Sequence, residues 1–259
     1  MDTAERLRIA RRLAEGGCVS ADDEADALLR AADEGEDLET LIARRLDGEP
    51  LAWIVGWTRF CDLRLHVDPG VFVPRPHTEA LATRASSLLP ETGTAVDLCT
   101  GSGAVAAVLA SKHPQATVIA TDLDPAAVSC ARRNGVPALQ GDLDEPVPSS
   151  LLERVDVMTA VVPYVPTEEL HLLPRDALAH EPRRALDGGR RGTSLLARAA
   201  SAATRWLRPG GSVLLELGGD QSDEITVTLA RLGLSGIRVH RDEDGQDRAI
   251  EARRPDSPG

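Results

Sequence analysis

The residues best suited to chemistry in this chain of 259 residues follow an apolar run that ends in an acid. Asp97 lies within residues 94–98, and Gly101, Ser102 and Gly103 follow it closely. From Ala104 onward, small and aliphatic side chains recur with helical spacing. Glycines let a backbone approach a ligand closely, and a helix N-terminus offers free N–H groups. We therefore predict a ligand-binding turn between a strand and a helix.

Two cofactor classes use such a turn. Enzymes that bind dinucleotides prefer a third glycine, and this chain has Ala106 at that position. Asp122 ends the next apolar run at a spacing that suits an acid binding ribose hydroxyls in either class. Asp97 decides between the classes, because a carboxylate repels a pyrophosphate but attracts the sulfonium and ammonium of S-adenosylmethionine. We predict S-adenosylmethionine as the cofactor, with a purely structural turn as the alternative.

Strand and helix patterns alternate after this turn, which predicts a mostly parallel sheet. Apolar runs predict the strands, and the last two segments fit a closing hairpin. The expected strands are 117–121, 138–140, 155–160 and 212–217, the expected helices are 104–113, 125–134, 193–207 and 225–232, and the hairpin spans 237–252.

The segment before the turn is organised differently. Residues 4–47 carry three helical stripes and no chemistry, residues 58–67 alternate like a hairpin, and residues 78–90 follow a Pro-Arg-Pro start as a helix. Such a helical module more often recognises a partner or covers a site than reacts. The pattern predicts a helical unit and a hairpin placed ahead of the α/β part.

Composition excludes several classes of protein. The formal net charge of −12 argues against direct binding of bare nucleic acid. The cysteines Cys18, Cys61, Cys99 and Cys130 lack C-x-x-C spacing, so we expect neither a metal site nor a disulfide framework. There is no signal-peptide pattern and no apolar run of membrane-spanning length. We expect a soluble cytoplasmic protein without a membrane partner, as a monomer or weak dimer.

Several segments together resemble the HemK/PrmC family of protein-(glutamine-N5) methyltransferases, which act on peptide chain release factors. They occur in the family's order, and in combination they are highly specific. The matching segments are residues 48–52 (Gly-Glu-Pro-Leu-Ala), 74–79 (Pro-Arg-Pro-His-Thr-Glu), the glycine turn at 97–103, 161–164 (Val-Val-Pro-Tyr) and 185–189 (Ala-Leu-Asp-Gly-Gly).

The resemblance runs from about Leu41 to Ala252. It implies an α/β fold, in which a class I methyltransferase domain has a Rossmann-like seven-stranded sheet. It also implies an N-terminal helical domain over residues 1–55, a β-hairpin connector over 56–75 and a catalytic domain over 76–259.

The same resemblance implies which residues bind the cofactor. The glycine turn would contact its methionine part, Asp122 its ribose, and Asp142 and Leu143 its adenine. Phe60 would pack in the core and shield the cofactor. The full predicted set is Phe60, Asp97, Cys99, Thr100, Gly101, Ser102, Gly103, Asp122, Leu123, Asp142, Leu143 and Val161.

One departure from the family concerns the acceptor loop. The family has Asn-Pro-Pro-Tyr, and an actinobacterial subgroup that is more similar has Asn-Val-Pro-Tyr, whereas this chain has Val161 at the Asn position. In the family, the Asn oxygen helps to hold the amide N–H groups and turns the nitrogen lone pair toward the methyl group. By analogy with the loss of one preorganised polar group, valine would cost about 2.7–4 kcal/mol, or about 100- to 1000-fold in rate. We expect poor methylation of a release-factor glutamine.

The predicted catalytic residues are Val161, Pro163, Tyr164 and His77. Tyr164 would form a wall of the acceptor pocket, although a packing ring is the simpler interpretation. His77 stands where the family usually has Glu, and histidine suits a general base near neutral pH, although it could equally be a surface residue.

We expect an S-adenosylmethionine-dependent methyltransferase that methylates a nitrogen acceptor by in-line displacement. The acceptor would be a protein side chain, such as a release-factor glutamine, or a small molecule. One alternative is a small-molecule methyltransferase of specialised metabolism. Another is a protein that binds S-adenosylmethionine without catalysis.

Overall fold

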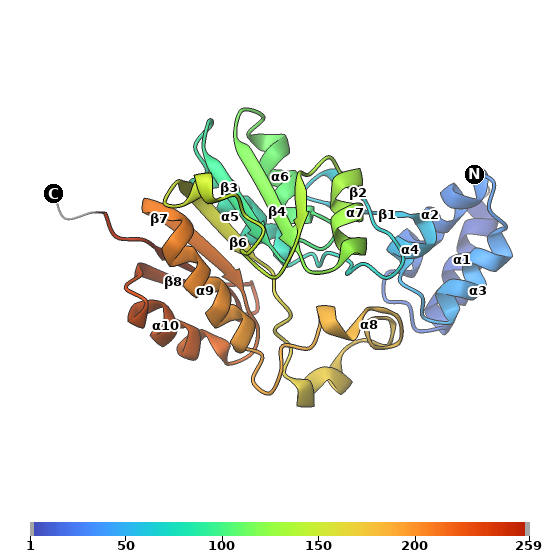
Figure 1. Cartoon of the computed structure of the whole chain (residues 1–259). Helices are drawn as coiled ribbons and strands as arrows, with labels where there is room; N and C mark the ends of the chain where they lie inside the picture. Colours follow the sequence, from blue (N-terminus) through green and yellow to red (C-terminus); the bar gives the residue numbers. More distant parts are fainter. Residues whose placement is uncertain (1–2, 257–259) are drawn as a thin grey trace.

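The computed structural model describes residues 3–256, apart from the side chains of residues 175 and 176. The first two and last three residues of the expected domain ranges thus lie outside the described residues. The chain begins with four helices, which stand to one side of the sheet in Figure 1. They share a core cluster that includes Ile9, Leu13, Leu28 and Leu41. The helices are α1 (Thr3–Glu15), α2 (Ala21–Asp33), α3 (Leu38–Leu46) and the unpredicted α4 (Leu51–Val55).

A two-stranded hairpin connects these helices to the rest of the chain, as predicted. β1 (Trp57–Phe60) pairs with β2 (Leu63–His66) in an antiparallel register. Trp57 is half-buried. The Arg64 guanidinium carbon lies 4.4 Å from the centre of the Trp57 ring, so the ring face is covered by a cation.

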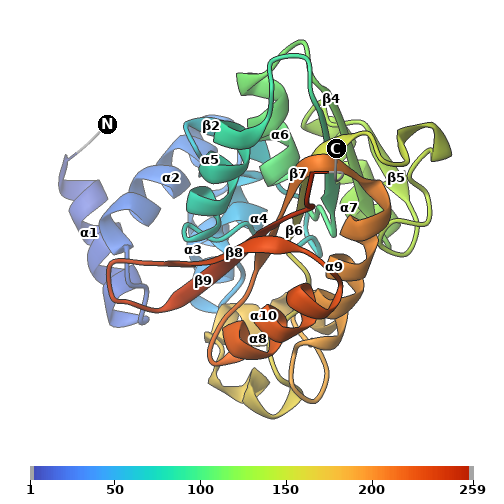
Figure 2. The same cartoon turned by 90° about the vertical axis from the view of Figure 1, so that its left-hand side faces the viewer.

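Seven strands form the central sheet of the described chain, which confirms the predicted α/β class. Their order is β5-β4-β3-β6-β7-β9-β8. The first five strands in this order pair in parallel, and β9 runs antiparallel to both β7 and β8, so the last hairpin closes the sheet (Figure 2). The strands are β3 (Thr94–Leu98), β4 (Thr117–Asp122), β5 (Ala138–Gln140), β6 (Val155–Ala160), β7 (Leu207–Glu216), β8 (Ser235–Arg241) and β9 (Asp247–Arg253).

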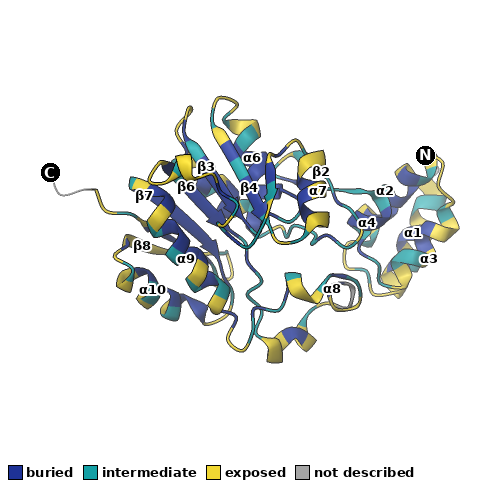
Figure 3. Ribbon diagram, viewed as in Figure 1, coloured by how far each residue is buried: buried dark blue, intermediate teal, exposed yellow. Residues whose placement is uncertain are grey.

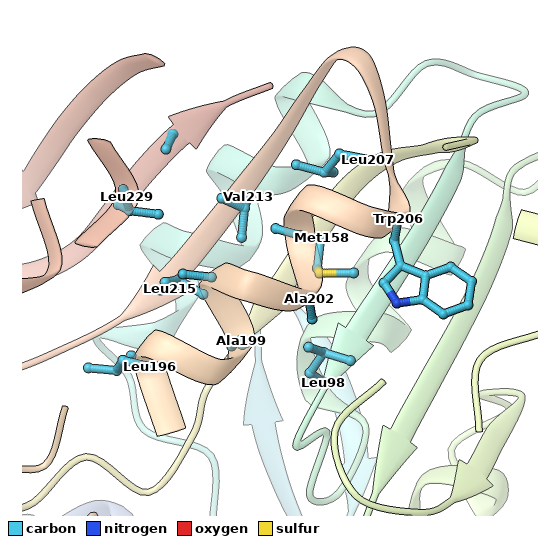
Figure 4. Close-up of a cluster of buried hydrophobic side chains, with 14 of the residues drawn as sticks. Leu98, Met158, Leu196, Ala199, Ala202, Trp206, Leu207, Val213, Leu215 and Leu229 are labelled. Carbon is cyan, nitrogen blue, oxygen red and sulfur yellow. The ribbon is translucent and has the colours of Figure 1, made fainter. Parts of the chain in front are cut away.

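Helices cover both faces of this sheet. On one face, α9 (Ser194–Trp206) and α10 (Gln221–Arg231) bury a cluster with Leu98, Met158 and Leu215 (Figure 4). On the other face lie α5 (Thr78–Leu88), α6 (Ala104–Lys112) and α7 (Pro125–Arg133). The central strands are buried throughout, as Figure 3 shows, because each face meets a helix layer. They therefore read as continuous apolar runs in the sequence.

An unpredicted segment of short helices lies between β6 and α9. It contains η2 (Thr167–Leu172), α8 (Arg175–His180) and η3 (Arg183–Ala185), and a further turn, η1 (Ser149–Leu151), precedes β6. In Figure 1 this segment lies below the edge of the sheet, on the side of the N-terminal helices. Pro-rich sequence with little periodicity hides such short helices from pattern analysis.

Two histidines of the fold make contacts inside the protein. The His180 ring meets Trp53 edge-on at 6.5 Å, and its Nε2 is buried. His113 Nε2 lies 3.0 Å from the Ser86 hydroxyl. Both are thus packing residues. Within residues 3–256, no helix combines the length and apolar character needed to cross a membrane.

Candidate functional site

The carboxyl ends of four parallel strands meet at one edge of the sheet. β3, β4, β6 and β7 pair in parallel, so Leu98, Asp122, Ala160 and Glu216 end at this edge. A cavity of about 1030 Å³ opens beside it. Ligands of open α/β sheets bind outside the carboxyl ends of the strands, so this cavity is the candidate site.

Most of the residues that the sequence singled out line this cavity. They come from the glycine turn after β3, from the loops after β4, β5 and β6, and from the start of α5. From the predicted set, the lining residues are His77, Asp97, Cys99, Thr100, Gly101, Ser102, Asp122, Leu123, Asp142, Leu143, Val161, Pro163 and Tyr164. Their individual roles stay predictions.

Asp97 is buried in the wall of the cavity. Its Oδ2 accepts a hydrogen bond from Thr100 Oγ1 at 2.6 Å, and its Oδ1 accepts one from Thr159 Oγ1 at 2.7 Å. Burial raises the pKa of this carboxyl to about 6, while the two hydroxyl bonds oppose the shift. The group is therefore mostly ionised at pH 7 and presents negative charge to the cavity.

Asp122 ties the glycine turn to the end of β4. Gly101 N donates to Asp122 Oδ2 at 2.8 Å, and Asp124 N donates to Oδ1 at 2.9 Å. Burial raises the pKa of this carboxyl above its ordinary value. Each carboxylate oxygen can accept a further bond, so Asp122 can still receive hydroxyl donors from a ligand.

The two glycines of the turn differ in their surroundings. Gly101 and Gly103 have φ values of 56° and 83°, in the left-handed region that favours glycine. A Cβ at Gly101 would meet no atom within 4 Å, whereas a Cβ at Gly103 would lie 3.0 Å from the Cβ of Ala131. Gly103 is absent from the cavity lining. The structure thus gives it a packing role beside α7, and its predicted contact with the cofactor stays a prediction.

Phe60 packs in the core, as predicted, and its role in shielding the cofactor stays a prediction. Its side chain is buried in the core with Leu65 and Leu81, and it does not line the cavity. The ring anchors the hairpin to α5. Any shielding of the cofactor by Phe60 would therefore be indirect.

The far end of the cavity combines apolar surface with one acid. Leu123 is 64% exposed there, which is unusual for a large aliphatic side chain, and Leu143 is buried with a φ of 49°. The Asp142 carboxylate pairs with Arg198 at 2.8 Å. Burial raises the pKa of the neighbouring Cys99 thiol, which keeps it neutral. This end suits a flat, apolar ring with polar edges.

Hydrogen bonds and close packing fix the backbone of the loop after β6. Gln221 Nε2 donates to the Tyr164 carbonyl at 2.6 Å and to the Arg191 carbonyl at 3.1 Å. Gly192 permits this packing, because a Cβ there would lie 1.9 Å from the Tyr164 carbonyl oxygen. Val161 and Tyr164 therefore reach the cavity from a backbone that is fixed by packing.

A polar cluster lies beside this loop. Tyr164 Oη donates to Glu216 Oε1 at 3.1 Å, and His77 Nε2 lies 3.3 Å from the same oxygen and 3.4 Å from Tyr164 Oη. Burial, together with the adjacent carboxylate, raises the pKa of Tyr164, so the phenol stays protonated. The structure brings together two predicted residues and one that was missed.

Glu216 was missed although the sequence carries a signal for it. It ends a buried apolar strand, as Asp97 and Asp122 stand near or at the ends of theirs. The arginines of the cavity were missed for another reason. Arg75 and Arg184 line the cavity and pair with acids that are distant in the sequence, Glu181 and Asp124. No local pattern links such partners.

The lining residues fit S-adenosylmethionine. The carboxyl groups of Asp97, Asp122 and Asp142 line the cavity, and each arginine among its lining residues is paired with an acid. These carboxyl groups match a ligand that carries a sulfonium, an ammonium and ribose hydroxyls, since opposite charges attract and hydroxyls donate. The open space at Gly101 admits the ligand close to the backbone.

Comparison with known proteins supports this interpretation. A family model described as FtsJ-like methyltransferase matches residues 79–241. A release factor glutamine methyltransferase of Geobacter sulfurreducens is 34% identical over 219 residues, covering 82% of this chain and 76% of that protein. The protein of that name in Mycobacterium leprae is 38% identical over 225 residues, covering 83% and 78%. The one in Streptomyces coelicolor is 34% identical over 276 residues, covering 97% of each.

The fold has a match among solved structures. The crystal structure of a methyltransferase from Pyrococcus furiosus superposes with a TM-score of 0.57 and 21% sequence identity, over 82% of this chain and 97% of that one. At this identity the match concerns the fold alone. The sequence relatives carry the family assignment, and the site fits the cofactor. The chain belongs to the release factor glutamine methyltransferase family and is an S-adenosylmethionine-dependent methyltransferase.

Proposed function

We propose that this enzyme methylates a nitrogen on a protein side chain, with a release-factor glutamine as the leading acceptor. The main observation in support is that the glycine turn and the loop with Val161 and Tyr164 line the same cavity. The relatives of 34–38% identity are named for a release-factor glutamine. Family membership therefore favours this function over a small-molecule acceptor or loss of catalysis. Such an acceptor would place the enzyme in the cytoplasm.

The shape of the cavity supports an acceptor carried by a chain segment. Its lining extends from the cofactor turn to Gly17, Val19 and Leu46 of the N-terminal helices. Val19 is 99% exposed. We regard residues 1–55 as a helical domain with its own core, 56–75 as a connector and 76–259 as the catalytic domain. An acceptor that enters between the helices and the sheet would contact both of these domains.

The residues of the site have separable tasks in this reaction. S-adenosylmethionine supplies a methyl group on a sulfonium, so transfer depends mainly on alignment. Asp97 and Asp122 hold the cofactor end, and Tyr164 forms the wall at the acceptor end. Val161 provides no side-chain acceptor for an amide N–H. We therefore expect slower transfer to a glutamine amide than an Asn at this position would allow.

The test is methyl transfer to a purified bacterial release factor. The full-length enzyme is incubated with the release factor and labelled S-adenosylmethionine, and peptide mass spectrometry locates the methyl group. We expect one methyl group on a glutamine side chain, and none on a release factor in which that glutamine is replaced by alanine. Transfer to a small molecule, with no transfer to protein, would overturn the proposal.

A further inference from the structure

The cluster of His77, Tyr164 and Glu216 contains an acid that does not itself line the cavity. The Glu216 side chain is 2% exposed, and it contacts His77 and Tyr164, which both line the cavity. Its Oε2 is buried with no hydrogen-bond partner among the described residues. An acid buried this deeply acts on a ligand through the groups that it contacts.

Glu216 determines which nitrogen of His77 carries the proton. An ionised carboxylate only accepts hydrogen bonds, so the nitrogen that faces it must donate. His77 Nε2 lies 3.3 Å from Glu216 Oε1, and Tyr164 Oη donates to the same oxygen. The neutral imidazole therefore carries its hydrogen on Nε2 and its lone pair on Nδ1.

The Nδ1 atom of His77 is available to a ligand. His77 lines the cavity with 28% of its side chain exposed. Over the described part of the chain, Nδ1 makes no hydrogen bond and is not among the buried polar atoms that lack a partner. Val161 lines the same cavity and offers no side-chain acceptor. His77 thus brings a nitrogen lone pair to the same cavity that Val161 lines without a side-chain acceptor.

We propose that Glu216 is a positioning residue that holds His77 with Nδ1 free, so that His77 accepts the proton of the acceptor nitrogen. The proposal rests on the proposed function, because it concerns a nitrogen acceptor in the same cavity. It makes His77 a catalytic residue in place of the side-chain oxygen that Val161 lacks. In this arrangement the base, His77, is oriented by a third group, Glu216, as the histidine of a catalytic triad is oriented by its acid.

The step balances in charge and atoms. The nitrogen lone pair forms the new bond to the methyl carbon as the carbon–sulfur bond breaks, and that electron pair stays on sulfur. The proton leaves nitrogen for His77 Nδ1, and its bonding pair remains on nitrogen. The imidazolium that results is stabilised by the Glu216 carboxylate and later releases its proton to water.

The titratable or charged groups around His77 come from four parts of the chain. Glu216 ends β7, Tyr164 follows β6, Arg75 precedes α5 and Arg248 belongs to β9. Both arginines lower the pKa of Tyr164, but burial and Glu216 raise it further, so Tyr164 stays protonated.

The first experiment does not depend on the acceptor. In full-length protein labelled with ¹⁵N, long-range ¹H–¹⁵N correlation at pH 8 reports the tautomer of each histidine, and loss of one signal set in His77→Ala assigns His77. We expect the Nε2–H tautomer in the wild type and a mixture in Glu216→Gln. An Nδ1–H tautomer in the wild type would overturn the proposal.

The second experiment measures transfer to the release factor across pH. We expect His77→Ala and Glu216→Gln to lower kcat about 100-fold with little change in KM. The pH profile of kcat should change in His77→Ala, and Glu216→Asp should recover part of the loss in kcat. His240→Ala is the matched control, because His240 Nε2 also lies near a glutamate, Glu251 at 3.0 Å, outside the cavity lining.

The outcomes separate the two proposals. An unchanged kcat and pH profile in His77→Ala would overturn the role of His77, even if the tautomer is as expected. Absence of wild-type transfer to any protein would refute the proposed function, while the tautomer measurement still tests the positioning by Glu216. Calorimetry of S-adenosylmethionine binding shows whether each variant keeps its fold.

Discussion

The two halves of the cavity differ in how completely their polar groups are paired. In the cofactor half, both oxygens of Asp97 accept hydroxyl bonds and both oxygens of Asp122 accept backbone N–H bonds, at 2.6–2.9 Å. In the acceptor half, Glu216 Oε2 has no partner among the described residues, and the contacts of His77 are 3.3–3.4 Å long. At the same sheet edge, the carboxyl groups of the cofactor half are thus fully hydrogen-bonded, whereas the acceptor half leaves Glu216 Oε2 unpaired among the described residues.

This difference indicates when each half becomes complete. A buried polar group without a partner costs about 1–3 kcal/mol, so a fold retains one only where something else compensates. The cofactor half is preorganised by the chain alone. In the acceptor half, His77 lines the cavity and can make a further contact when an acceptor binds, whereas Glu216 Oε2 lies outside the cavity lining. Selectivity for the acceptor therefore depends on few residues, and single substitutions there should have large effects.

The largest expected effect concerns Val161. Adding Val161→Asn to the His77→Ala variant restores a side-chain acceptor for the amide N–H. We expect kcat on a release-factor glutamine to rise about 100- to 1000-fold over His77→Ala alone, corresponding to about 2.7–4 kcal/mol. In the wild-type background the gain should be smaller, because His77 already accepts. Equal gains in both backgrounds would show that the two side chains act independently.

The next largest effect concerns Asp122, in the cofactor half of the cavity. Asp122→Ala removes an acceptor for ribose hydroxyls and frees Gly101 N, so S-adenosylmethionine affinity should fall by about 1.5–3 kcal/mol in calorimetry. Asp156→Ala is the matched control. Asp156 also accepts a backbone N–H bond, from Thr94 at 2.8 Å, but lies outside the cavity lining. Equal losses in both variants would mean that the effect is one of folding.

The glycine turn gives a third, smaller effect on stability. Gly103→Ala places a methyl group 3.0 Å from the Ala131 Cβ, so we expect a loss of about 1–3 kcal/mol in the free energy of unfolding. Gly101→Ala meets open space and costs mainly the left-handed backbone conformation, about 1–2 kcal/mol. Urea titration should therefore rank Gly103→Ala as the less stable variant, and calorimetry should rank Gly101→Ala as the weaker binder. The reverse ranking would contradict their assigned roles.

The smallest effect is a pH dependence of cofactor binding. The pKa of Asp97 is raised to about 6, so protonation below that pH removes the charge that attracts the cofactor. Affinity should fall about tenfold between pH 7 and pH 5, and Asp97→Asn should be weak at both pH values.

Stability should follow the opposite trend with pH. A carboxyl whose pKa is raised in the folded state favours folding below its unfolded pKa, and this contribution is lost as pH rises through about 6. The free energy of unfolding of the wild type, relative to Asp97→Asn, should thus fall between about pH 4 and pH 6. A parallel fall of binding and stability on acidification would show that Asp97 is not the titrating group.

Particular elements show which parts of the fold could be predicted from the sequence alone. The strand, glycine turn and helix around Asp97 could be predicted, because apolar period and glycine conformation are local properties. The hairpin at residues 58–67 could be predicted for the same reason, because its alternating pattern is also a local property. α4 and the short helices after β6 were not predicted, since each is too brief for a periodic signal.

The sequence by itself determined the fold class, the cofactor turn and the order of the strands along the chain. These follow from local periodicity and from residue types at fixed spacing. Only the tertiary structure decided that Gly103 packs against Ala131, and that Glu216 contacts His77. The physical reason is distance along the chain: His77 and Glu216 are 139 residues apart, and the packing of α5 on the sheet, where Leu81 and Leu214 share one core cluster, brings them together.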